Sequence, residues 1–382
     1  MVKQAISLFA TPVRARRRRL GARLEAWYGE HRRDLPWRRT RDPYSIWISE
    51  AMLQQTRVDT VVDYWTRFID RFPDAESLAR ADVDQVLQLW SGLGYYRRAR
   101  ALHSAAVKLV EEHHGHFPRS RAELLALPGI GPYTAGAVLS IAFDLPEALV
   151  DGNVERVFAR LFALDAPLDD PAFRRHCWDL ARLFVVDVGS PRAWNQALME
   201  LGATVCTPRR PKCEVCPVRL SCAARASDRA DELPRPKRRR ASVAVSVEIL
   251  VVRRGDRLLL QKRPAQGRMA GLHELPTRER PAEGVGTLTG LFPDVWPSST
   301  ASGAALLDTT ADRTSLGEFR HGITHHRIRA ELVAGQRLPR ADLDPRFSWV
   351  PFAELDRWPL TGMARKAREQ LSGWIGNLAA PE

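Results

Sequence analysis

The stretch CTPRRPKCEVCPVRLSC, at residues 206–222, decides the fold of this chain. It contains four of the five cysteines in the spacing Cys-x6-Cys-x2-Cys-x5-Cys, so four soft thiolate ligands can converge on one centre. Zinc ribbons usually pair two tight CxxC knuckles, whereas only Cys213 and Cys216 form such a knuckle here. The spacing alone leaves zinc and an iron–sulfur cluster open, with Cys206, Cys213, Cys216 and Cys222 as ligands.

The other cysteine, Cys177, lies in the helix-like FRRHCWDLARLF, and we expect it to be a packed core thiol. This cysteine usage does not resemble a disulfide framework and favours a reducing compartment. No apolar run approaches membrane-spanning length, and the N-terminus has no hydrophobic core of the signal-peptide type. We expect a soluble monomer that has no membrane partner. We also expect a cytoplasmic, nucleoid-associated protein of the bacterial type.

The net charge of the chain indicates the class of its binding partner. The chain has a formal net charge of +13 although it contains 45 acidic residues. An excess of this size suits a polyanion, and DNA or RNA is a commoner polyanionic partner than a membrane. A basic, solvated surface without a nucleic-acid partner is the alternative that charge alone leaves open.

The pattern of apolar residues changes along the chain. At 382 residues the chain is too long for one ordinary core, so we expect more than one domain. Apolar residues at three- and four-residue intervals predict a helical domain over residues 1–230. A basic, Pro-rich linker follows at residues 231–242, and alternating strand-like segments then predict an α+β domain over residues 243–382. The predicted fold class is therefore multidomain.

A glycine-rich turn lies within residues 124–142, where LPGIGPYTAGAVLSIA begins at Leu127. Gly129 and Gly131 can adopt positive φ and allow the backbone to approach a ligand closely. The N–H groups at the start of the following helix can then face an anion such as a phosphate. An ordinary connection between two helices is the alternative interpretation of this segment.

Together these motifs resemble the endonuclease III and MutY-type superfamily of DNA glycosylases. The resemblance implies an all-α helix-hairpin-helix glycosylase domain, a structural [4Fe–4S] cluster at residues 206–222, and phosphate binding at Gly129 and Gly131. Relatives of the endonuclease III type carry a lysine directly after the turn that attacks the sugar. This chain has Tyr133 there, and a phenol cannot form an imine. The resemblance therefore implies a monofunctional enzyme that uses water as the nucleophile.

Two carboxylates are candidates for the chemistry. Glu50, in IWISEAMLQQT, has apolar neighbours that would raise its pKa by desolvation, although a solvent-facing helix position is the plainer interpretation. Asp151 lies in LVDGNVERVF, where the plainer interpretation is a turn that starts a helix, with Asp151 or Asn153 as its N-cap. The resemblance implies that Glu50 protonates adenine at N7 and that Asp151 stabilises the cationic sugar. Asn153 and Tyr133 support them in this scheme.

Further residues match the family's contacts to DNA. Base extrusion leaves a gap in the helix that side chains must fill. By resemblance, Gln55 and Tyr95 enter the base stack, Thr56 and Leu93 touch the opposite base, and Arg38 lies near the base pocket. The apolar residues in this set could equally be core residues, which is the ordinary fate of such side chains on helices.

The C-terminal domain resembles the nudix-like domain of MutY-type enzymes. LLLQKRPAQGRMAGLHELP begins at Leu258 and matches its pattern, with His273 at the usual tryptophan position. No REx2Ex2E cluster for Mg²⁺ is present, so we expect a reader without hydrolase activity. In FRHGITHHRI, Thr324 and His325 align with the lesion-contacting residues, and Ile323 replaces an aromatic one.

The expected function is excision of adenine from double-stranded DNA that contains A:8-oxoguanine or A:G mispairs. A thymine–guanine mismatch glycosylase is the runner-up, and Glu50 and the second domain weigh against it. A non-catalytic damage sensor is opposed by the presence of Glu50 and Asp151. A nucleotide hydrolase is opposed by the missing acidic cluster.

Overall fold

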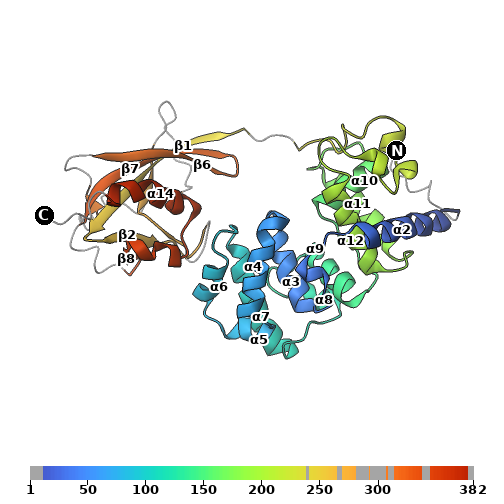
Figure 1. The fold of residues 1–382 in the computed structure, drawn as a ribbon, viewed down its shortest axis with the longest axis horizontal. Coiled ribbons are helices and arrows are strands. Elements are labelled where there is room, and N and C mark those ends of the chain that lie inside the picture. Colours follow the sequence, from blue (N-terminus) through green and yellow to red (C-terminus); the bar gives the residue numbers. More distant parts are fainter. Residues whose placement is uncertain are drawn as a thin grey trace. The chain divides into compact units, whose positions relative to one another are not determined.

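The protein is described by a computed structural model that covers residues 12–237, 241–264, 269–280, 292, 307–308, 314–337 and 345–376. It divides into two compact units (Figure 1). The first comprises Met1–Ala81 and Arg100–Arg239, and the second comprises Asp82–Ala99 and Arg240–Glu382. A short part of the predicted helical domain, Asp82–Ala99, thus packs with the C-terminal residues.

The first unit is helical, as the sequence predicts. Among the described residues, none of the helices combines the length and apolar composition needed to cross a bilayer. The α-helices that lie wholly or largely in this unit are α2 (Pro12–His31), α3 (Pro43–Leu53), α4 (Val58–Arg71), α5 (Ala75–Arg80), α7 (Arg97–His113), α8 (Arg121–Leu125), α9 (Pro132–Ala137), α10 (Gly152–Leu161), α11 (Pro171–Val185), α12 (Pro191–Thr204) and α13 (Ala223–Ala226). Short helical turns are η1 (Pro36–Arg38), the π-helical η2 (Val138–Ala142), η3 (Cys213–Val215) and η4 (Arg219–Ser221).

Local signals in the sequence explain where several of these helices begin. Asp42, Asp170 and Ser190 accept hydrogen bonds from the first backbone N–H groups of α3, α11 and α12. A proline follows each of them directly, and its fixed φ suits the first helical position. Aspartate, asparagine and serine are strong caps because their side-chain oxygens satisfy N–H groups that have no partner within the helix.

The core of the first unit lies where α10, α11 and α12 pack together. Phe184 and Trp194 stack with ring centroids 5.5 Å apart and planes only 1° from parallel. Cys177 is fully buried in this cluster, and burial raises the pKa of its thiol to about 12. It is a core thiol, as predicted from its sequence context.

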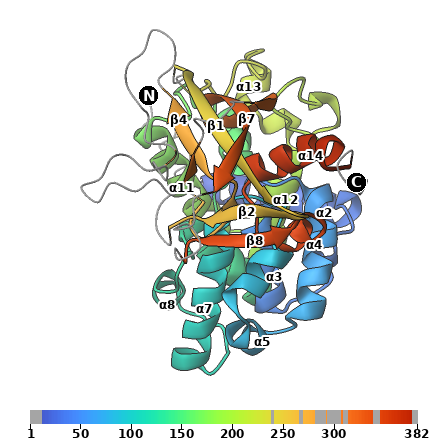
Figure 2. The same cartoon turned by 90° about the vertical axis from the view of Figure 1, so that its left-hand side faces the viewer.

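The second unit contains α6 (Val83–Leu89), a mixed sheet and α14 (Gly362–Gly376). β1 pairs in parallel with β7 and antiparallel with β2 and β4, and Figure 2 shows β1 between β4 and β7. β6 and β5 pair with β7, while β3 and β8 pair with β2. The strands are β1 (Val243–Arg254), β2 (Arg257–Lys262), β3 (His273–Glu274), β4 (Thr277–Arg280), β5 (Leu307–Asp308), β6 (Ser315–Ile323), β7 (His326–Arg337) and β8 (Phe347–Pro351), and η6 (Phe352–Arg357) follows β8.

The core of this unit explains one departure from the sequence pattern. The alternation expected for β1 gives way to burial of every residue from 247 to 252. Val247, Ile249 and Val251 join the core that also contains residues of α14, whereas Leu250 and Val252 pack with Leu259 in a second cluster. Both faces of the central strand are therefore covered, which is typical of a strand with a parallel neighbour.

Candidate active site and cysteine loop

Glu50 is a buried carboxyl on an apolar helix. Every residue of α3 from 44 to 52 is buried, and the Glu50 side chain is only 5% exposed. Burial raises the pKa of Glu50 to about 7; the hydrogen bond from Tyr133 and the charge of Arg38 oppose the rise, and Asp151 adds to it. The plainer interpretation, a solvent-facing glutamate, is wrong because α3 has no solvent-facing side at this position. A carboxyl with this pKa can hold a transferable proton near neutral pH.

Tyr133 connects Glu50 to the turn after α8. Its hydroxyl lies 2.5 Å from Glu50 Oε2 and 3.3 Å from the sulfur of Met199 on α12. Burial raises the pKa of Tyr133 well above its usual value, so the phenol keeps its proton and donates it in a hydrogen bond. Tyr133 occupies the position at which relatives of the endonuclease III type carry a lysine, and here it orients the carboxyl group of Glu50.

Asp151 is both a helix cap and a partly buried carboxyl group. Its Oδ1 accepts from the backbone N–H of Val154 at 2.8 Å, and its Oδ2 accepts from Asn153 Nδ2 at 2.8 Å. Burial raises the pKa of Asp151 although both hydrogen bonds lower it. The capping role inferred from the sequence is confirmed, and it fixes the carboxylate at the start of α10 where it acts electrostatically on Glu50.

Gly129 and Gly131 differ in their φ angles and in the space available for a side chain. Gly129 has a φ of +75°, and a Cβ there would lie 2.5 Å from the Cβ of Ala101. Gly131 has an ordinary φ of −95° as the N-cap of α9, and a Cβ there would meet nothing within 4 Å. Only Gly129 is therefore required by the fold, while the open space at Gly131 leaves the backbone accessible.

An ion-pair network that the sequence did not reveal surrounds Arg38. Glu200 on α12 is fully buried and accepts from Arg33 at 2.8 Å and from Arg38 at 2.7 Å. Burial alone would raise the pKa of Glu200, but these two guanidinium groups bring it down to about 2. The charged Glu200 holds Arg38, whose charge acts on Glu50. A glutamate inside the apolar run WNQALMELG was the available signal.

Arg156 joins the carboxylate side of the site to the cysteine loop. Its guanidinium donates to Asn153 Oδ1 at 2.8 Å, to the Gly202 carbonyl at 2.7 Å and to the Cys206 carbonyl at 2.7 Å. A Cβ on Gly202 would lie 2.6 Å from the Cβ of Asn153, so α10 and α12 approach closely here. The position of Asn153 beside Asp151 thus depends on the start of the cysteine loop.

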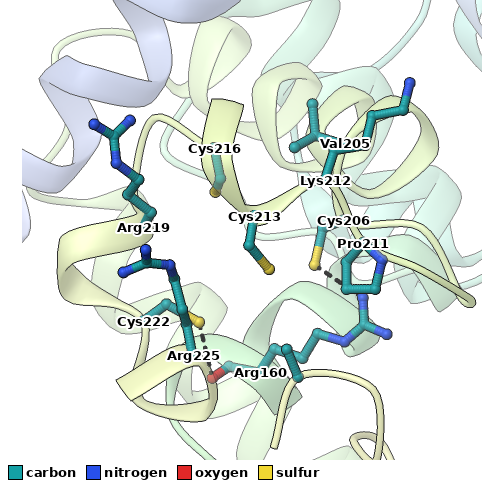
Figure 3. A pocket seen from close by; sticks show the side chains of 11 residues that line it. Arg160, Val205, Cys206, Pro211, Lys212, Cys213, Cys216, Arg219, Cys222 and Arg225 are labelled. Atoms are coloured by element: carbon teal, nitrogen blue, oxygen red, sulfur yellow. Dashed lines mark hydrogen bonds between the residues drawn. The ribbon is translucent and has the colours of Figure 1, made fainter. Parts of the chain in front are cut away.

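The four cysteines line a single pocket together with Arg160 and Arg225 (Figure 3). Arg160 is 2% exposed and donates to Cys206 Sγ at 3.3 Å and to the carbonyls of Thr207 and Leu233. The buried Arg160 guanidinium thus places a positive charge beside the sulfur of Cys206. Within the described residues, no group of three or more His, Cys, Asp or Glu side chains is arranged to hold a single metal ion.

Three of the residues predicted to contact DNA share an unusual backbone conformation. Gln55, Tyr95 and Thr324 have φ values of 60°, 49° and 55°, in the left-handed region that residues other than glycine rarely adopt. Gln55, in the first unit, is exposed, and Tyr95, in the second, is 57% exposed. Leu93 is only 6% exposed, so of the pair in the LGYY segment Tyr95 is the one at the surface.

The tip of the β6–β7 hairpin carries the residues predicted to contact the lesion. Thr324 and His325 form the two-residue loop between the paired Ile323 and His326. Thr324 is exposed, whereas Ile323 packs partly against the core of its unit. Ile323 thus supports the hairpin from inside the domain.

His273, at the position where the family has a tryptophan, is also a packing residue. It is 6% exposed and makes an edge contact with Trp358 at 4.7 Å between ring centroids. Burial lowers its pKa to about 4, so it is neutral under ordinary conditions.

Each of the two units contains a segment that matches a known family or domain model. Residues 48–183 match the model of the HhH-GPD superfamily base excision DNA repair proteins, and residues 248–370 match the NUDIX domain model. Adenine DNA glycosylase of Rattus norvegicus is 37% identical over 87% of this chain and 73% of its own length. The Arabidopsis thaliana protein of the same name is 37% identical over 81% of this chain and 56% of its own length.

A solved structure resembles the helical part. A thermostable thymine-DNA glycosylase is 31% identical, with a TM-score of 0.50, over 55% of this chain and 97% of its own. Its base specificity differs from that of the two adenine relatives, although the matched part has the same fold. Base specificity therefore has to be inferred from individual residues.

Proposed function

The chain belongs to the adenine DNA glycosylase family, within the HhH-GPD superfamily, and on this premise we propose that it excises adenine mispaired with 8-oxoguanine or guanine. The observation that carries the proposal is the buried Glu50, with its pKa near 7, held by Tyr133 and facing the charge of Asp151. The nudix-like unit, with Thr324 and His325 on an exposed turn, supplies the reader of the opposite base.

The carboxyl groups of Glu50 and Asp151 divide the reaction between them. Adenine is a poor leaving group unless it is protonated, and protonated Glu50 donates to N7 of the extruded base. The C1′–N9 bond then breaks, and ionised Asp151 stabilises the positive charge that develops on the sugar. A water molecule adds at C1′ and passes a proton to the Glu50 carboxylate, which completes the hydrolysis and restores the acid. Tyr133 holds Glu50 and Asn153 holds Asp151 through the hydrogen bonds described above.

The cysteine loop is suited to a [4Fe–4S] cluster. Four cysteines line one pocket, so this loop offers the four sulfur ligands that a [4Fe–4S] cluster needs. The cluster would be structural, with all four ligands supplied by cysteine. The exposed Arg209, Arg210, Lys212 and Arg219 on this loop would contact DNA phosphates.

The proposal is tested by single-turnover cleavage of duplexes that contain A:8-oxoguanine, A:G, A:T or T:G. We expect base release from A:8-oxoguanine and A:G, and release from A:T slower by about 10²-fold because a paired base is costlier to extrude. Thymine release from T:G without adenine release would identify the runner-up function, in line with the thymine-DNA glycosylase fold neighbour. No release from any duplex would contradict the proposed function and leave the damage-sensor and nucleotide-hydrolase alternatives.

The absence of a lysine at Tyr133 predicts weak covalent trapping. Tyrosine cannot form the imine that borohydride reduces, so wild-type enzyme should give little protein–DNA adduct on a duplex that it cleaves. Tyr133→Lys is the matched variant, because it places an amine at the same position and should increase trapping. Adduct formation by the wild type in amounts that match base release would contradict the monofunctional mechanism.

The pH dependence of adenine release should follow the two carboxyls. Glu50 must be protonated, so kcat/KM should fall above pH 7, by about tenfold per pH unit. Asp151 must be ionised, so activity should also fall at acid pH as its raised pKa is crossed. Tyr133→Phe removes a hydrogen bond that lowers the pKa of Glu50, so its alkaline limb should move to higher pH. A flat profile between pH 6 and 9 would exclude Glu50 as the proton donor.

A further inference from the structure

The loop at residues 91–96 packs within the second unit. It connects α6 to α7 and contains LGYY, with Tyr95 as its exposed residue. Asp82–Ala99 belongs to the same compact unit as the nudix-like fold. The predicted wedge residue Tyr95 and the predicted lesion contacts Thr324 and His325 therefore belong to one body.

The loop is shaped by its own backbone. Gly92, Gly94 and Tyr95 all have positive φ values, of 110°, 71° and 49°. Trp90 Nε1 donates to the Gly94 carbonyl at 3.1 Å, and Arg98 Nη2 donates to the same carbonyl at 3.2 Å. The Arg98 guanidinium also lies 5.5 Å from the centre of the Tyr95 ring, within the range of a cation–π contact. These contacts hold the middle of the loop.

Arg365 on α14 holds both ends of the loop. Its Nη2 donates to Ser91 Oγ at 2.5 Å and to the hydroxyl of Tyr96, and it lies 3.4 Å from the Leu360 carbonyl. Tyr96 is 9% exposed and in turn donates to the Leu360 carbonyl at 3.4 Å. Ser91 and Tyr96 flank the exposed segment, so one guanidinium fixes the distance between its two ends.

Neighbouring basic residues on α14 have different contacts. Arg368 pairs with Asp356, and Lys366 Nζ donates to the Arg320 carbonyl on β6 at 3.1 Å. The latter contact, and the packing of α14 against β6, join the helix to the strand that leads into the Thr324–His325 turn. A continuous path of contacts therefore runs from the lesion-reading hairpin through α14 to the loop that carries Tyr95.

We propose that Arg365 is a positioning residue for the wedge, which couples recognition of the opposite base to insertion of Tyr95. This inference rests on the proposed function for its substrate. By holding Ser91 and Tyr96, Arg365 keeps Tyr95 exposed and in its left-handed conformation. The strength of this restraint follows from hydrogen bonds that a charged donor makes to partly or wholly buried acceptors.

The test compares Arg365→Met with Arg368→Met, which removes the same charge from the same helix but leaves the loop contacts intact. In Arg365→Met, hydrogen exchange of the peptide that covers residues 91–96 should accelerate about tenfold, the effect of losing hydrogen bonds to a charged group. The preference for A:8-oxoguanine over A:G in single-turnover rate should fall by a similar factor. Arg365→Lys should restore part of both, and Arg368→Met should change neither.

Tyr96→Phe provides a second variant that keeps the aromatic ring in the core. If Arg365 acts through Tyr96, the effects of Tyr96→Phe and Arg365→Met on the preference should not add in the double variant. Unchanged exchange or an unchanged preference in folded Arg365→Met would overturn the proposal. Failure of the wild type to release adenine would instead refute the proposed function, and the exchange comparison would still decide whether Arg365 holds the loop.

Discussion

Replacing Glu50 with glutamine is expected to lower the single-turnover rate constant for adenine release by about 10³-fold, with duplex affinity retained. Glutamine has nearly the same shape and can still accept the hydrogen bond from Tyr133, but it has no proton to give to N7. The measurement is base release from A:8-oxoguanine duplexes at saturating enzyme, alongside binding to the same duplex. Residual turnover within tenfold of the wild type would rule out Glu50 as the general acid.

The same variant should be more stable than the wild type at alkaline pH. The folded-state pKa of Glu50, about 7, lies above the ordinary 4.5, so wild-type stability is full below pH 4.5 and declines as pH rises through 7. At pH 8 the ionisation of buried Glu50 lowers the free energy of unfolding of the wild type by about 3 kcal/mol. Glu50→Gln removes this loss because glutamine does not ionise. Thermal unfolding at pH 5 and pH 8 separates this effect from loss of folding. A variant that loses activity because it is unfolded would instead melt earlier at both values.

Replacing Asp151 with asparagine should reduce base release by about 10²- to 10³-fold, the range found when one group that stabilises transition-state charge is removed. Asparagine caps helices about as well as aspartate, so α10 should still begin at the same residue. Only the negative charge that we propose to stabilise the sugar cation is lost. Binding of the uncleaved duplex should therefore change far less than the rate constant measured in the same single-turnover assay.

A matched control for this variant is Asp170→Asn, at the N-cap of α11. Asp170 accepts from the backbone N–H of Ala172 as Asp151 accepts from that of Val154. Since Asp170 has no part in the proposed chemistry, its replacement should leave base release unchanged and affect thermal stability only slightly. Equal losses of activity in the two variants would mean that capping, and not charge, explains the effect at Asp151.

The sequence alone predicts those features of the structure that depend on residues close together in the chain. The cap at Asp151 and the turn at Gly129 follow from residues within a few positions of one another. The cysteine run is equally local, because its ligands lie within one loop. In each case a short segment contains both the strained or unsatisfied backbone and the side chain that relieves it.

Contacts between distant segments could not be predicted in the same way. Arg33 and Glu200 are 167 positions apart, and no periodicity within either helix indicates that they pair. Burial of Glu50 depends on elements that cover every side of α3, and burial of Leu93 depends on packing around its loop. The membership of Asp82–Ala99 in the C-terminal unit is likewise set by contacts such as Arg365 with Ser91, 274 positions away.

The left-handed backbone at Gln55, Tyr95, Arg210 and Thr324 creates a conflict between thermal stability and DNA repair activity. Each of these residues bears a conformational cost of about 1 kcal/mol or more that glycine would not. Under selection for heat resistance alone, these four positions are expected to drift towards glycine, and each such step would remove a side chain that we propose to contact DNA. Variants obtained in this way should survive heating well while leaving more mutations unrepaired.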